Sequence, residues 1–165
     1  MAESTTTSNN LNAAGQSYDD AAATEEVSAE LDAMVCDVLD EFLNALADGD
    51  DPGVLLCVED AASARYEAAF TEDGPQACID GARHFIEMNQ GGVPSDHVGP
   101  IDRYAIAYAG AVELDGEFAD AIIVSFYQRG MANGYSAYLL YSGAGTGEHF
   151  MWSDPEPAGE EPPLI

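Results

Sequence analysis

Alternating side chains over residues 103–152 predict consecutive strands of an antiparallel sheet. Tyr104, Ile106 and Tyr108 alternate with alanines, which is the two-residue period of a strand. Asp115-Gly116 stands between two such stretches and predicts a tight hairpin, because a type I′ turn needs positive φ at both central residues. The expected strands are 103–109, 121–127, 135–141 and a short edge strand at 149–152.

Two further segments have the period of a helix. Apolar residues recur at helical spacing from Val27 to Leu46, which predicts a helix over 25–47 with Thr24 as its N-cap. A second ridge through Cys36, Leu39 and Leu43 widens its apolar face, which indicates burial against the sheet and allows a contact with another chain. The second helix is expected to begin near Pro75 and to end before Gly91-Gly92.

The segment between the two helices predicts a strand followed by an ambiguous stretch. Residues 54–58 form a continuous apolar run, typical of a strand buried on both faces. Residues 61–70 alternate as a strand would but are also rich in alanine, so both strand and helix fit; a hairpin is favoured. The predicted fold class is therefore α+β. An antiparallel sheet of about five to six strands packs with two main helices, in the order α-β-β-α-β-β-β with an eighth element at the edge.

The pattern also predicts the domain limits. Residues 1–23 lack periodicity and are expected to be a flexible polar tail, 24–153 a single α+β domain, and 154–165 an acidic, proline-rich C-terminal tail. Two strands are apolar on both faces, and both helices could lie on the same face. A bare apolar face would then need cover from the tail or from a second copy, which favours a homodimer.

The charge balance changes the expected setting and partners. The chain has 31 acidic residues against 4 basic ones, a net charge of −27, yet 47% of its residues are hydrophobic. A folded core under a carboxylate-rich surface suits a salt-adapted, halophilic cytoplasm, where screening weakens self-repulsion. Four dispersed arginines cannot form the basic patch that nucleic acid or an anionic membrane requires. The sequence shows no signal peptide and no apolar run of transmembrane length.

Aromatic residues on the predicted strands are the candidate interface or pocket residues. Tyrosine combines apolar area with a polar tip and is enriched in interfaces and ligand clefts. The same rings are also ordinary components of strands. The candidates are Tyr104, Tyr108, Tyr127, Tyr138, Tyr141 and Trp152.

A second candidate site is a metal centre built from His97, His149 and Asp154. Two imidazoles and a carboxylate can hold zinc and leave a position open to activate water. The spacing matches no zinc motif, and three surface histidines would also explain the residues.

These observations favour a non-enzymatic domain that self-associates or binds a protein partner, without a cofactor. The alternatives are a small metal-dependent hydrolase that uses the histidine and aspartate cluster, and a small-molecule sensor with a tyrosine-lined pocket. No catalytic residue is assigned, because no nucleophile or acid–base motif is present.

Overall fold

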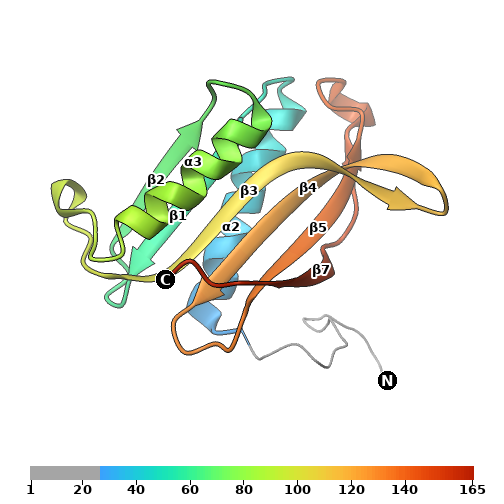
Figure 1. The fold of residues 1–165 in the computed structure, drawn as a ribbon. Helices are drawn as coiled ribbons and strands as arrows, with labels where there is room; N and C mark the ends of the chain where they lie inside the picture. The colour runs from blue at the N-terminus through green and yellow to red at the C-terminus, as the bar shows by residue number, and fades with distance from the viewer. Residues whose placement is uncertain (1–26) are drawn as a thin grey trace.

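The structure, a computed structural model, describes residues 27–165 and confirms the predicted α+β class. Over this range two α-helices pack with a seven-stranded antiparallel sheet (Figure 1). The elements are α2 (Ala29–Ala47), β1 (Val54–Asp60), β2 (Arg65–Phe70), α3 (Pro75–Met88), η1 (Pro94–Asp96), β3 (Ile101–Leu114), β4 (Glu117–Gln128), β5 (Gly134–Ser142), η2 (Gly147–His149), β6 (Met151–Trp152) and β7 (Glu156–Glu161).

The strands are arranged in the order β2-β1-β3-β4-β5, with β6 and β7 both pairing with β5. The ambiguous stretch at 61–70 contributes strand β2, so the hairpin prediction is confirmed. Asp115 and Gly116 have φ values of 51° and 84°, as the predicted β3–β4 turn requires. Of strand β4, only Ala121–Phe126 pair with β5. The outer part of the β3–β4 hairpin therefore extends beyond the sheet as a two-stranded arm.

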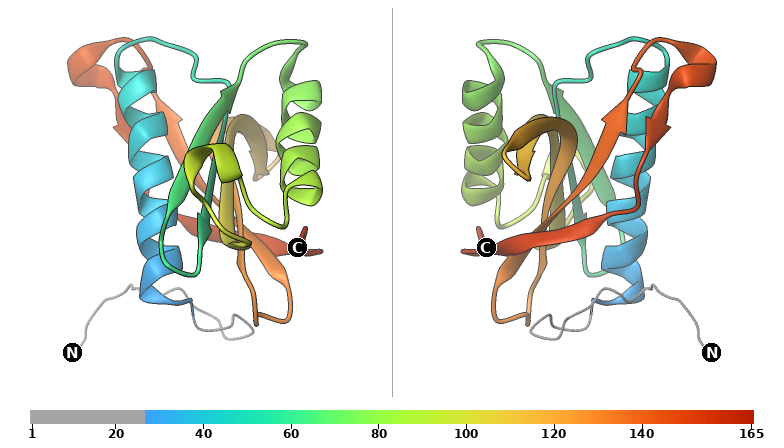
Figure 2. Two further views of the ribbon diagram at one scale, coloured as in Figure 1. Left: turned by 90° about the vertical axis from the view of Figure 1, so that its left-hand side faces the viewer. Right: turned by 90° about the vertical axis from the view of Figure 1, so that its right-hand side faces the viewer.

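The two helices lie on opposite faces of the sheet (Figure 2). One face packs against Leu31, Met34 and Phe42 of α2, and the other against Ala82 and Ile86 of α3. The expectation that both helices could share a face is therefore wrong, and the packing reason for a covering second copy is removed. Because β1 lies between both helices, it is buried along its whole length, as its continuous apolar run predicted.

Helix α2 begins later than its sequence pattern indicates. Its N-cap is Ser28, whose hydroxyl accepts a hydrogen bond from the Leu31 N–H at 3.0 Å. The predicted cap, Thr24, lies outside the described residues. Of the second apolar ridge, Leu39 is buried and Leu43 half-buried, both against the sheet. Cys36, the third residue of this ridge, is exposed, so only part of the widened apolar face is used in the chain's own core.

A buried ion pair ties β1 to β3 on the α2 side of the sheet. Glu59 accepts a hydrogen bond at 2.7 Å from Arg103 Nε, and both residues are almost inaccessible to solvent. Arg65 reaches the other carboxylate oxygen of Glu59 at 2.6 Å, and Asp102 contacts Arg103 at 3.2 Å. Arg65 and Arg103 therefore have a structural role, in which their positive charges are paired with carboxylates of the same domain.

The last segment, interpreted from its composition as a tail, adds strand β7 to the sheet. It pairs antiparallel with β5 from Gly134↔Glu161 to Tyr138↔Glu156. Residues 162–165 then turn toward α3 across the sheet (Figure 1). No helix in the part of the chain that the structure describes has the length and apolar character needed to cross a bilayer.

Candidate functional site

The predicted aromatic candidates do not share one site but divide between the two faces of the sheet. Tyr104 and Tyr127 are buried and Tyr108 is half-buried in the cluster under α3, and the strand register places Tyr138 beside them. Tyr141 packs instead against the α2 cluster. Trp152 lies opposite Tyr141 and remains 56% exposed. Only the group on the α3 side takes part in the site described next.

The segment after β7 is held against this group by main-chain hydrogen bonds. The Leu164 N–H donates to the Tyr104 hydroxyl oxygen at 3.2 Å, and Gln90 Nε2 donates to the Leu164 carbonyl at 3.3 Å. Leu164 and Ile165 are half-buried against the cluster that contains Tyr104 and Tyr127. This apolar pair therefore packs on the apolar cluster on the α3 side of the sheet.

Glu161 anchors the same segment with its side chain. The Ser125 hydroxyl donates to Glu161 Oε2 at 3.1 Å, and Arg83 Nη2 stands 3.8 Å from Oε1. Ser125 is 3% exposed and projects from β4 toward the α3 side, whereas Arg83 on α3 is partly open to solvent. A buried neutral donor and a half-exposed cation therefore meet one carboxylate.

Two tyrosines beside this carboxylate stay protonated at neutral pH. Burial raises the pKa of Tyr104 to about 12. Burial, followed by the nearby negative charge of Glu161, also raises the pKa of Tyr108, while the positive charge of Arg83 and then a hydrogen bond with Ser125 partly offset the shift. Since both phenols are neutral, the charge of the site comes from Arg83 and from the carboxylate it meets.

Gly134 allows β7 to approach at the point where Glu161 pairs. A Cβ atom at this position would lie 3.1 Å from the Glu161 carbonyl oxygen and 3.7 Å from the Tyr104 hydroxyl. The glycine therefore leaves room for the added strand next to the tyrosine that holds Leu164.

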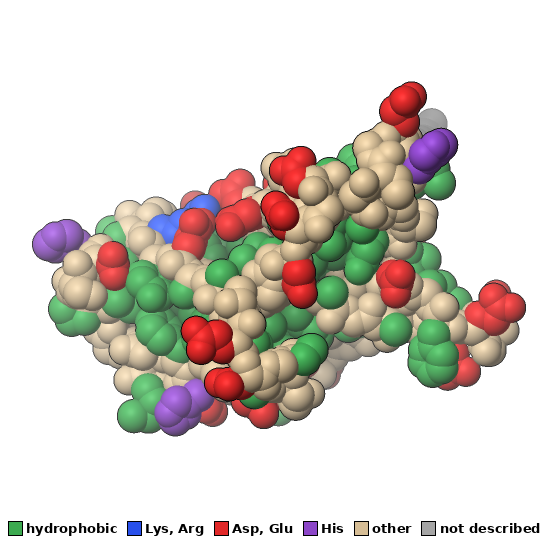
Figure 3. All heavy atoms as spheres, turned by 90° about the horizontal axis from the view of Figure 1, so that it is seen from above, with side chains coloured by type: hydrophobic (Ala, Val, Ile, Leu, Met, Phe, Trp, Pro, Cys, Tyr) green, Lys and Arg blue, Asp and Glu red, His purple; other side chains and the backbone are tan. Residues whose placement is uncertain are grey.

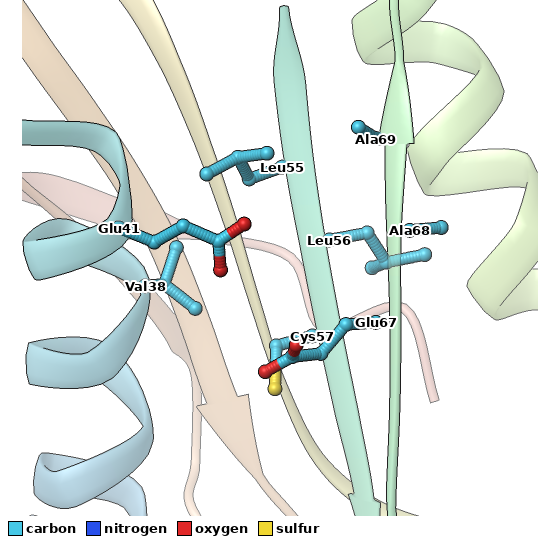
Figure 4. Close-up of a pocket in the computed structure, with 8 residues that line it drawn as sticks. All are labelled: Val38, Glu41, Leu55, Leu56, Cys57, Glu67, Ala68 and Ala69. Atoms are coloured by element: carbon cyan, nitrogen blue, oxygen red, sulfur yellow. The ribbon is translucent and has the colours of Figure 1, made fainter. Parts of the chain in front are cut away.

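A separate groove of about 250 Å³ runs between α2 and the β1–β2 hairpin (Figure 4). Glu41 and Glu67 project from opposite sides of it, and Val38 and Leu55 line it. Cys57 in its wall is fully buried, and burial raises the pKa of this thiol to about 12. The thiol is therefore protonated and unsuited to nucleophilic chemistry.

The residues of the predicted metal centre are not brought together. Over residues 27–165, no group of three His, Cys, Asp or Glu side chains is placed to hold a metal ion. His97 follows η1, His149 ends η2, and Asp154 lies between β6 and β7. The histidine side chains stand apart on the molecular surface, among carboxylates spread over the face in view (Figure 3).

Compared with known proteins, the chain matches no protein-family model, no curated protein and no solved structure.

Proposed function

We propose that this protein is a protein-binding domain that takes an extended segment of polypeptide along the outer edge of β5. The observation that carries the proposal is the position of residues 156–165, of which 156–161 pair with β5 while Leu164 and Ile165 pack on the apolar cluster under α3. In this state the chain's own segment occupies the site. A segment from a partner would use the same main-chain hydrogen bonds.

The composition of β7 supports an exchangeable strand rather than a core strand. Its sequence, Glu-Pro-Ala-Gly-Glu-Glu, has no large apolar residue, and five of its six residues are exposed. Just before β7 the chain is attached to β5 by the short strand β6 and by Ser153, which forms hydrogen bonds of 2.8 Å with the Leu140 main chain. Asp154 and Pro155 are exposed and connect this point to β7. Release of β7 therefore removes no large apolar side chain of the strand itself from the core, and release of Leu164 and Ile165 uncovers only the part of the α3-side cluster on which they pack.

The setting that we propose is a salt-rich cytoplasm, on the basis of the net charge of −27. The site faces a segment that is itself acidic, with Glu156, Glu160 and Glu161. Screening in concentrated salt reduces the repulsion between such a segment and the domain.

The test uses the full chain and a labelled synthetic peptide of residues 156–165. In the double variant Leu164→Asp/Ile165→Asp the chain's own segment loses its apolar contacts, so it competes less for β5. The variant should bind the peptide more tightly than the unmodified chain, by roughly tenfold for each 1.4 kcal/mol that held the segment in place.

The matched control is Leu114→Asp/Phe118→Asp at the tip of the β3–β4 arm. It makes the same chemical change at residues that are 38% and 76% exposed and far along the sheet from β7. It should bind the peptide as the unmodified chain does. Equal peptide affinity in all three proteins, or no binding to any of them, would refute the proposal.

A further inference from the structure

The geometry points to a recognition rule for this site: it selects an extended segment of another protein that carries a glutamate three residues before an apolar pair. The inference rests on the proposed function and specifies the partner. The chain's own Glu161-Pro162-Pro163-Leu164-Ile165 is the reference ligand.

The first element of the rule is the carboxylate. Ser125 is the polar residue on the α3 side of β4 within a stretch of apolar neighbours, and it is 3% exposed. Its hydroxyl donates to Glu161 at 3.1 Å. The carboxylate is a charged acceptor and a stronger one than the neutral Tyr108 hydroxyl that also contacts Ser125, so the site favours a segment that supplies a carboxylate at this position. Arg83 adds a preference for negative charge at the same point.

The second element is the apolar pair. Leu164 and Ile165 pack against the cluster that includes Tyr104, Tyr127 and Ile86. The Tyr104 hydroxyl fixes the position of the first of them by accepting the Leu164 N–H at 3.2 Å. A polar residue at this position would lie against buried rings without a partner.

The third element is the spacer. Pro162 and Pro163 separate the carboxylate from the apolar pair, and proline fixes φ near −65° in an extended, polyproline-like chain. A stiff spacer loses little conformational entropy when both ends are bound. The spacing between the two anchors is therefore set before binding.

The experiment measures peptide binding to the Leu164→Asp/Ile165→Asp chain, in which the site is open. The probes are the peptide of residues 156–165 and three derivatives, with Glu161→Gln, with Leu164→Ala/Ile165→Ala, and with Pro162→Gly/Pro163→Gly. The first two changes should each weaken binding by about tenfold, and the glycine change by about threefold.

Each anchor is then tested from the side of the domain. Adding Ser125→Ala to the open chain should remove most of the tenfold difference between the unmodified peptide and the Glu161→Gln peptide, because the two groups contact each other. Adding Ser142→Ala instead is the control, since this exposed serine at the end of β5 lies outside the pairing with β7. It should leave the difference intact.

The outcomes separate this inference from the proposed function. If the unmodified peptide fails to bind the open chain, the proposed function is wrong. If it binds but the four peptides have the same affinity, the site accepts any extended segment; if Ser125→Ala leaves the glutamate preference unchanged, Ser125 is not the residue that recognises the glutamate. The recognition rule is then wrong and the proposed function stands.

Discussion

The Leu164 N–H and the Tyr104 hydroxyl, 60 positions apart in the chain, form a hydrogen bond of 3.2 Å. The bond joins the segment after β7 to β3, which lies two strands in from β5, the partner of β7. The segment is thus held at two places, by strand pairing at the edge and by contacts over the α3 side of the sheet.

Tyr104→Phe should loosen the segment without unfolding the domain. The change removes the acceptor of the Leu164 N–H, a loss of about 0.5–1.5 kcal/mol, and keeps the buried ring. Hydrogen exchange at β7 and at Leu164 should quicken. Tyr127→Phe, whose hydroxyl donates to the Met131 carbonyl at 3.2 Å, is the matched control and should not change exchange in β7. Equal effects of the two variants would contradict the assigned role of Tyr104.

Attachment of β7 should depend on salt. The segment carries three glutamates and lies on a protein with a net charge of −27. The screening length grows from about 3 Å in 1 M salt to about 30 Å in 0.01 M salt, so repulsion increases as salt is removed. Exchange protection of β7 should therefore fall in dilute KCl before that of β1 or β3.

The variant Glu156→Gln/Glu160→Gln tests the cause of this salt dependence. It removes two charges from exposed positions of β7 and leaves Glu161 in place. Its β7 protection should change less between molar and dilute KCl than that of the unmodified chain. An identical salt response would show that repulsion of the segment is not the cause.

Arg103→Met should destabilise the domain by about 3–5 kcal/mol, because it leaves Glu59 buried with fewer partners. The second change Glu59→Leu in the same chain removes the stranded charge and should restore a large part of the stability. Denaturant unfolding of the two variants measures both effects. A double variant as unstable as Arg103→Met would contradict this account of the ion pair.

Asp60 should contribute to the acid sensitivity of the loop at 92–100. Its carboxylate accepts N–H groups from Gly99 at 2.7 Å and from Ala64 and Ala62 at 2.9 Å each, and these bonds, that of Gly99 first, lower its pKa. A lowered folded pKa means that the stabilisation is complete above the ordinary aspartate value near 4 and is lost as the pH falls below it. Asp60→Asn should flatten this part of the stability–pH curve; an unchanged curve would contradict it.

Much of the fold could be predicted because its strong patterns are local. The alternation from Tyr104, the Asp115-Gly116 turn and the apolar run of β1 each identify one element from neighbouring residues. The face on which each helix lies was not predicted, because a helix pattern shows that it has a buried side but not which side of a sheet covers it. The apolar run of β1 indicated a strand buried on both faces, and such a strand needs a cover on each face. This was the available signal that the helices lie on opposite sides of the sheet.

Most of the candidate site could not be predicted. β7 is an edge strand exposed on both faces, so its residues carry no alternation, and glycine and proline in it indicate a loop. Two weak signals were present. Ser125 interrupts an otherwise apolar strand, and Leu164-Ile165 end an acidic segment with apolar residues. Neither signal indicates a binding site until the fold shows that Ser125 and the Leu164-Ile165 pair lie on the same side of the sheet.

The central claim is that a partner segment replaces β7 on β5, and hydrogen exchange in the unmodified full chain tests it most directly. An excess of the peptide of residues 156–165, distinguished by isotope labelling, is added in molar KCl. The account predicts faster exchange in the chain's own β7, protection of the peptide, and unchanged protection in β5. Protection of the peptide with no change in β7 would place it elsewhere on the domain and would contradict the claim.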